Sequence, residues 1–74
     1  MHLPPPEGEI LLDVDGPVLL IGIHRPAKRN GFTPTMYRQL AQAYTRLDDD
    51  PELRVGVLYA EGGHFTAGLD LPAF

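Results

Sequence analysis

A chain of 74 residues has room for at most one small domain, and a domain of this size buries only about 60% of the surface that its unfolded chain exposes. Its formal net charge of -4, with scattered lysines and arginines, argues against nucleic acid or an anionic membrane surface as a partner. The absence of cysteine excludes disulfides and thiolate metal sites, and the three histidines lack the spacing of metal ligands. No apolar run reaches the roughly 20 residues that span a bilayer, so the expected compartment is the cytosol.

The first eight residues contain three consecutive prolines and a glycine. Such a composition favours extended backbone that contributes little to a core, so residues 1–8 are expected to form a disordered, proline-rich arm. The folded part of the chain is then expected to span residues 9–74.

Two apolar runs rich in β-branched residues follow the arm, at residues 9–14 and 18–24. They are separated by Asp15-Gly16-Pro17, and an Asp-Gly pair between two such runs predicts an antiparallel β-hairpin. The second run is almost continuously apolar. This pattern predicts a strand that is covered on both faces.

Thr33-Pro34 is typical of a helix start, with a hydroxyl N-cap followed by proline at the first helical position. The helix is expected to run to about Asp48 and to bury one stripe of side chains. Residues 48–52 read as a turn before a proline, with a cation site as the alternative, and residues 55–60 predict a further strand. The predicted order is β-β-α-β, an α/β arrangement in which the helix connects two parallel strands. The expected buried stripe is Met36, Leu40, Ala43, Tyr44 and Leu47, and the expected outward residues are Arg38, Gln39, Gln42 and Arg46.

The chain offers few side chains for catalysis, because it has neither cysteine nor serine and no evident carboxylate pair. What remains is the backbone: the N–H groups after Ala67 and Gly68 follow a strand's C-terminal end, where open α/β sheets place ligands. A glycine-rich turn that only connects two elements is the simpler alternative. The basic group Arg25, Lys28 and Arg29 has the same two interpretations, a solvated loop or an anion site.

Two short motifs, in this order and at this separation, resemble the crotonase or enoyl-CoA hydratase/isomerase family. They are residues 23–30, Ile-His-Arg-Pro-Ala-Lys-Arg-Asn, and residues 65–71, Phe-Thr-Ala-Gly-Leu-Asp-Leu, with the helix, the acidic turn and the strand between them. The resemblance covers nearly all of residues 9–74. It implies a partial crotonase-like domain, a β-β-α-β fragment of a repeated ββα spiral that is usually assembled into trimers or hexamers.

The resemblance also implies a function for the second motif. In the family, the backbone N–H between the Gly and Asp of Ala-Gly-x-Asp donates to the thioester oxygen of a coenzyme A substrate, and that position is Leu69 here. Coenzyme A enters as part of the substrate, so no separate cofactor is expected. The residues that the resemblance places at substrate are Lys28, Arg29, Ala67, Gly68, Asp70 and Leu71.

Departures from the family pattern leave the reaction open. The family often has Asn at His24 and Ala-Leu at Gly31-Phe32, while Leu69 in place of alanine is more similar to isomerase-like members. The second oxyanion donor and the acid/base carboxylates come later in the family chain. We therefore expect the N-terminal part of an acyl- or enoyl-CoA-binding protein, inactive alone. The alternative is a small non-enzymatic binding or assembly module that uses the crotonase-like unit.

Overall fold

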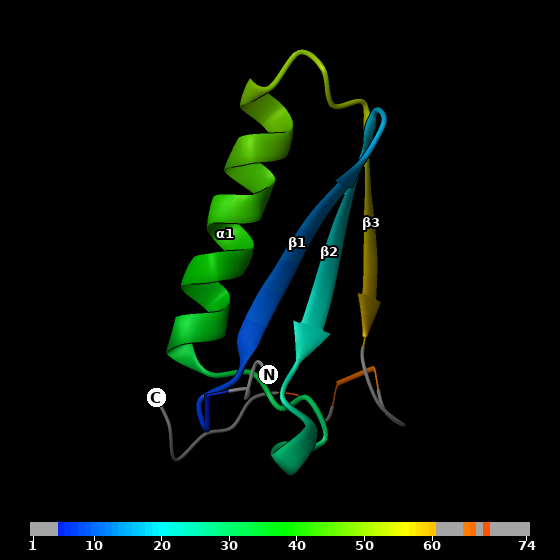
Figure 1. Ribbon diagram of the computed structural model, residues 1–74. Helices are drawn as coiled ribbons and strands as arrows, with labels where there is room; N and C mark the ends of the chain where they lie inside the picture. Colours follow the sequence, from blue (N-terminus) through cyan, green and yellow to red (C-terminus); the bar gives the residue numbers. More distant parts are fainter. Residues whose placement is uncertain (1–4, 61–64, 67, 69–74) are drawn as a thin grey trace.

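The computed structural model describes residues 5–60, 65, 66 and 68. Strands β1 (Glu9–Asp15) and β2 (Val18–His24) are followed by a 3₁₀ turn η1 (Pro26–Lys28), helix α1 (Pro34–Asp49) and strand β3 (Val55–Ala60). Figure 1 shows a three-stranded sheet with α1 on one side, and the sheet order is β1-β2-β3. The predicted β-β-α-β order and α/β class are confirmed.

The hairpin forms where the Asp-Gly signal predicts it. β1 and β2 pair antiparallel from Glu9↔His24 to Asp15↔Val18, and Gly16 lies in the turn with a positive φ of 58°. Glycine adopts this left-handed conformation without the steric cost that a side chain brings. Because residues opposite each other share a face, Ile10, Leu12 and Val14 lie on the same face as the odd-numbered residues of β2.

Helix α1 begins as its sequence predicts, with the Thr33 hydroxyl accepting a hydrogen bond from the Met36 N–H at 3.3 Å. It crosses over so that β3 pairs parallel with β2, from Val18↔Val55 to Ile23↔Ala60. At its end, Asp50 forms a turn in which its carboxylate accepts from the Glu52 N–H at 2.9 Å. None of the helices in the described part of the chain has the length and apolar character needed to cross a membrane.

Two residues of α1 correct the predicted buried stripe. Tyr44 is 49% exposed, although it was expected inside, and Gln39 was expected to face away. Instead the Gln39 side-chain oxygen accepts a hydrogen bond from the Ile10 N–H of β1 at 2.7 Å. Each residue turns the helix by about 100°, so both positions lie at the margins of the stripe. The helix packs more closely against β1 than against β2, and Gln39 contacts β1 while Tyr44 stays exposed.

The core lies between α1 and one face of the sheet. Its centre is made of Leu19, Ile21 and Ile23 from β2 against Met36 and Ala43 from the helix, all of which are at most 1% exposed. Gly56 of β3 lets Leu47 of α1 pack directly against the strand, because a Cβ at position 56 would come within 2.8 Å of the Leu47 side chain. This dense layer explains why the odd-numbered residues of β2 are apolar.

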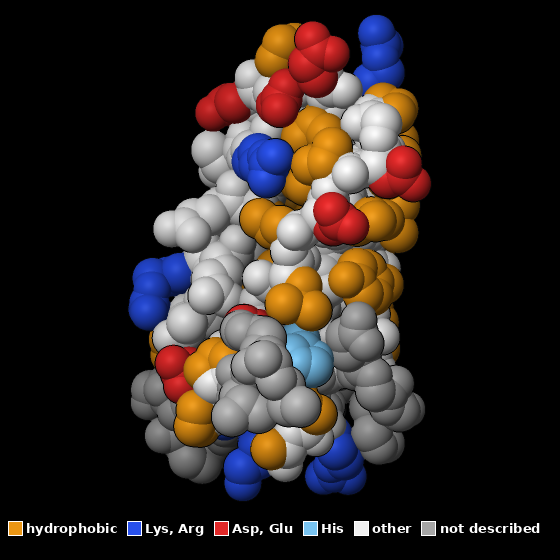
Figure 2. Space-filling model, in the orientation of Figure 1, with side chains coloured by type: hydrophobic (Ala, Val, Ile, Leu, Met, Phe, Trp, Pro, Cys, Tyr) orange, Lys and Arg blue, Asp and Glu red, His pale blue; other side chains and the backbone are white. Residues whose placement is uncertain are grey.

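The opposite face of the sheet corrects the expectation that β2 is covered on both sides. Val55 and Val57 of β3 point to this face and are 50% and 42% exposed, and Leu20 of β2 is only half-buried. Hydrophobic side chains gather over the strands in Figure 2. Within the described residues, only Gly22 on this face of β2 is buried, since the Tyr59 ring lies against it.

The four described residues of the expected arm make specific contacts with the folded unit. Pro5 to Gly8 form a turn closed by a 2.9 Å hydrogen bond from the Gly8 N–H to the Pro5 carbonyl. The Thr33 hydroxyl donates to the Glu7 carbonyl at 2.7 Å, and Gly8 is buried. Backbone carbonyls of residues 5–8 thus accept hydrogen bonds from the folded unit that composition alone does not reveal. Residues 1–4 lie outside the described residues, and the domain boundary stays a prediction.

The arm's contacts predict a measurable cost for a side chain at Gly8. Gly8 has a φ of +79°, and a Cβ there would come within 2.7 Å of Met36 Sδ and 2.8 Å of Arg25 Cβ. Gly8→Ala is therefore expected to lower the free energy of unfolding by about 2 kcal/mol in urea denaturation, through overpacking and backbone strain. Gly16→Ala is the matched control, because it shares the positive φ but has nothing within 4 Å. Equal losses in the two variants would mean that the arm is not packed as described.

Candidate functional site

The candidate site begins where β2 ends. Arg25 precedes Pro26, and the proline cannot donate to a strand ladder, so the chain leaves the sheet and forms η1. The Arg25 carbonyl accepts from the N–H groups of Lys28 at 3.2 Å and Asn30 at 2.9 Å. These bonds fold residues 25–30 back into a tight corner at the carboxyl end of the strand.

Asn30 holds this corner from inside. Its backbone has a φ of 59°, directly after Arg29 with a φ of 50°, and asparagine accepts this conformation better than most residues. Its side-chain oxygen accepts a 2.7 Å hydrogen bond from the Arg25 N–H, and Asn30 is only 1% exposed. The side chain therefore satisfies a buried donor at the point where β2 stops.

The guanidinium of Arg25 connects three segments of the chain. Its Nε donates to the Pro6 carbonyl at 2.9 Å and its Nη1 to the Gly31 carbonyl at 3.2 Å, while only 7% of the residue is exposed. Sequence reasoning grouped Arg25 with Lys28 and Arg29 as one basic cluster. The structure separates them: Lys28 and Arg29 are exposed, whereas Arg25 is a buried organising residue. The one sequence signal for this difference is the position of Arg25 at the end of a buried strand.

Residues from the second motif dock onto the same corner. The Thr66 hydroxyl donates to the Asn30 carbonyl at 2.6 Å, and it accepts from the Gly68 N–H at 3.1 Å. The Gly68 carbonyl in turn accepts from the Phe32 N–H at 2.8 Å. Gly68 therefore has both of its backbone polar groups engaged. Its φ of 95° is a conformation that glycine adopts readily.

The structure brings together the two motifs that the sequence separates by a helix and a strand. A Cβ on Gly31 would lie 3.2 Å from the Lys28 carbonyl and 3.7 Å from the Gly68 carbonyl, so Gly31 sits between them. Figure 1 places this corner at the end of the sheet toward which β2 and β3 both point. Gly68, Lys28 and Arg29 are thus at one end of the fold. The other predicted site residues, Ala67, Leu69, Asp70 and Leu71, lie outside the described residues.

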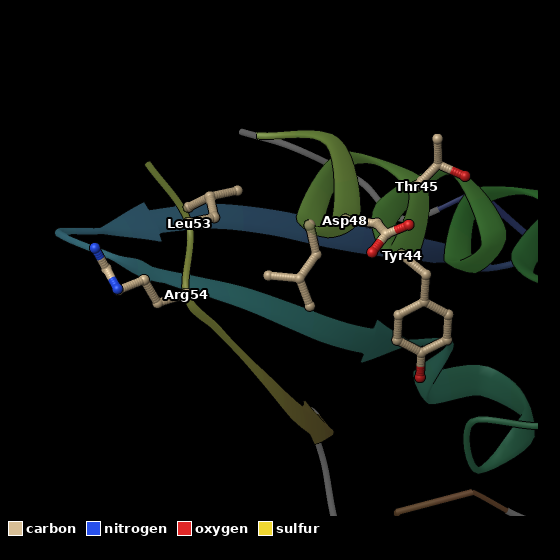
Figure 3. A pocket seen from close by; sticks show the side chains of 6 residues that line it. Tyr44, Thr45, Asp48, Leu53 and Arg54 are labelled. Atoms are coloured by element: carbon tan, nitrogen blue, oxygen red, sulfur yellow. The ribbon is translucent and has the colours of Figure 1, made fainter. Parts of the chain in front are cut away.

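An open pocket of about 570 Å³ lies at the opposite end of the molecule. Figure 3 shows its lining from the last turns of α1 and the segment before β3, including Tyr44, Asp48 and Arg54. Neither motif contributes a residue to it. The backbone corner is the stronger candidate, because it holds fixed polar groups at the carboxyl ends of two parallel strands.

Comparison with known proteins gives one consistent result. The family model described as enoyl-CoA hydratase/isomerase matches residues 13–74. Enoyl-CoA hydratase EchA19 of Mycobacterium tuberculosis is 40% identical over 65 residues, which is 88% of this chain and 24% of that protein. The hydroxycinnamoyl-CoA hydratase-lyase of Pseudomonas fluorescens is 31% identical, over 88% of this chain and 24% of that protein.

Solved structures show the same likeness. A probable enoyl-CoA hydratase/isomerase from Mycobacterium abscessus superposes with a TM-score of 0.83 at 52% identity, covering 86% of this chain and 25% of that one. The fold is therefore that of a crotonase-like unit, as the two motifs together implied. The chain spans about a quarter of the length of the relatives that it matches.

Proposed function

Because the chain belongs to the enoyl-CoA hydratase/isomerase family, we propose that it is the part of such a protein that receives the thioester of an acyl- or enoyl-CoA. The proposed donor is the backbone N–H of Leu69, which forms one half of an oxyanion hole. The second donor and the acid/base carboxylates would come from other segments of a longer protein. The proposal accordingly assigns no turnover to these 74 residues alone.

One observation carries this proposal: the 2.8 Å hydrogen bond from the Phe32 N–H to the Gly68 carbonyl. It ties the residue before the proposed donor to the rigid corner at the end of β2. Negative charge develops on the thioester oxygen when water adds or a proton leaves beside it, and a preorganised N–H is worth about 2.7–4 kcal/mol there. Because the donor is a backbone group, a leucine side chain is compatible with the role.

The exposed cations nearby support the same ligand class. Lys28 is the last residue of η1 and Arg29 follows it, at the corner that holds Gly68. Coenzyme A carries phosphates, which such side chains bind. We propose that they contact the phosphates or the pantetheine arm, and that Ala67, Asp70 and Leu71 complete the loop. A cytoplasmic location, assembly into trimers or hexamers and independence from a further cofactor remain predictions.

The test is a titration of the ¹⁵N-labelled chain with butyryl-CoA, followed by NMR. A thioester oxygen that accepts from the Leu69 N–H is expected to move this amide resonance downfield, while coenzyme A without an acyl group leaves it in place. Hydration of crotonyl-CoA by the chain alone is expected to be undetectable. A butyryl-CoA titration that leaves Leu69 unmoved while other amides respond would contradict the proposed donor.

A second candidate function is favoured by the open face of the sheet. Val55 and Val57 are about half exposed there, as in a surface that meets another protein. In this alternative the unit is a binding or assembly module without chemistry. The alternative predicts the opposite outcome of the same titration, in which no amide responds to butyryl-CoA. It also predicts that the chain sediments as a complex of several copies.

A further inference from the structure

The peptide that follows Gly68 has its orientation set by groups outside the second motif. The Gly68 carbonyl accepts from the Phe32 N–H at 2.8 Å, and the Gly68 N–H donates to the Thr66 hydroxyl at 3.1 Å. A hydrogen bond at each end of the residue leaves little freedom to rotate about its φ and ψ. Gly68 has no side chain that could fix it in another way.

Because a peptide unit is planar, fixing the Gly68 carbonyl also constrains the N–H of the same peptide unit. A trans peptide is planar, and its C=O and N–H point to opposite sides. The Gly68 carbonyl shares its peptide plane with the next N–H in the chain. A partner that fixes the Gly68 carbonyl oxygen therefore restricts the directions that the following N–H can take.

Thr66 connects Gly68 to Asn30, because its hydroxyl both accepts and donates a hydrogen bond. The oxygen accepts from Gly68, and the hydrogen is donated to the Asn30 carbonyl at 2.6 Å. Asn30 is itself held by the Arg25 N–H, so the chain of hydrogen bonds continues to the end of β2. A hydroxyl can donate and accept simultaneously, whereas the valine side chain of equal shape can do neither.

We propose that Thr66 and the Phe32 N–H are positioning groups: together they aim the amide that follows Gly68 at the thioester oxygen. This inference rests on the proposed function, since it assigns a purpose to the direction of that amide. Thr66 does not touch the substrate in this role. It acts through Gly68, and the corner of residues 30–32 acts as the fixed support.

The experiment compares two ligands that differ only in the carbonyl group: butyryl-CoA, a thioester, and S-butyl-CoA, the thioether. The ratio of their dissociation constants with the full chain measures the carbonyl interaction alone. Thr66→Val is expected to reduce the preference for the thioester by about three- to tenfold, the typical net value of a hydrogen bond. Its affinity for the thioether is expected to be unchanged. Thr66→Ser, which restores the hydroxyl, is expected to restore the preference.

The outcomes separate the two proposals. If the unaltered chain shows no preference for the thioester, the proposed function fails, and this inference fails with it. If the chain prefers the thioester and folded Thr66→Val keeps that preference, only the positioning role is overturned. A purely structural role for Thr66 would weaken both ligands equally and leave the ratio unchanged.

A measurement on the unaltered chain keeps the inference testable even if Thr66→Val does not fold. A scalar coupling through the hydrogen bond between the Phe32 nitrogen and the Gly68 carbonyl carbon is expected by NMR. Slow hydrogen exchange of the Phe32 amide is expected as well. Absence of the coupling together with exchange at the rate of an open peptide would overturn the positioning role.

Discussion

Replacing Asn30 with alanine is expected to lower the free energy of unfolding by about 3 kcal/mol, one of the largest losses for any single substitution in this chain. The Arg25 N–H loses the side-chain oxygen of Asn30, to which it donates at 2.7 Å. Asn30 is only 1% exposed, so water does not readily replace the lost acceptor. Alanine must also adopt the left-handed φ of 59°. For a chain of 74 residues, total stability is expected to be about 4–11 kcal/mol, so the loss is a large fraction. Urea denaturation followed by circular dichroism measures it.

The variant Asn30→Gly separates the two causes. Glycine removes the side-chain acceptor but accepts the positive φ, so it is expected to be about 1 kcal/mol more stable than Asn30→Ala. The Thr66 hydroxyl donates to the backbone carbonyl of residue 30, which both variants keep. This hydrogen bond is therefore expected to be lost only if the corner itself rearranges. Stability equal to that of the unaltered chain in both variants would show that Asn30 does not hold the corner.

Truncating Ile21 to alanine is expected to cost about 3–4 kcal/mol, because it opens a cavity at the centre of the core. Ile21 is 1% exposed and packs in the cluster formed by Leu19, Ala43 and Leu53. The measurement is the urea midpoint at constant slope, which separates a loss of stability from a change in the unfolding transition.

Leu12→Ala is the matched control for this cavity. Leu12 is the cross-strand partner of Ile21 on the same face of the sheet, but it is 42% exposed. Removing its side chain is expected to cost only about 1 kcal/mol, since 42% of the residue is already in contact with water. Similar losses at the two positions would mean that the core is not centred on β2.

Local signals in the sequence were sufficient for the strands and the α-helix of this fold. Asp15-Gly16 sets the hairpin, and Thr33-Pro34 sets the start of α1 through a hydroxyl cap that the structure contains. Coverage of the sheet was not predictable in the same way. An apolar residue such as Val57 has the same pattern whether a partner covers its face or not, because the pattern records hydrophobicity and not what lies opposite.

The candidate site shows the same division. The motif around Gly68 was visible because Ala67 and Gly68 are small residues that follow a strand, and because the motif resembles that of a known family. The hydrogen bonds that hold Gly68 were not predictable, since they join residues far apart in the sequence. Thr66 and Asn30 are 36 positions apart, and Gly68 bonds to Phe32. Arg25 was grouped with Lys28 and Arg29, as a solvated loop or an anion site, because the backbone carbonyls that it contacts cannot be identified from the sequence.

The central position of β2 has a consequence for the order of folding. Its pairing with β1 closes a short loop, whereas its pairing with β3 brings Val18 to Val55 only after the whole of α1 has crossed over. Loop-closure entropy is lower for the first event, so the hairpin is expected to form early and β3 to dock late. One edge of β2 is therefore unpaired during the interval. That edge, and not the finished sheet, is where newly made chains are expected to meet each other before the fold is complete.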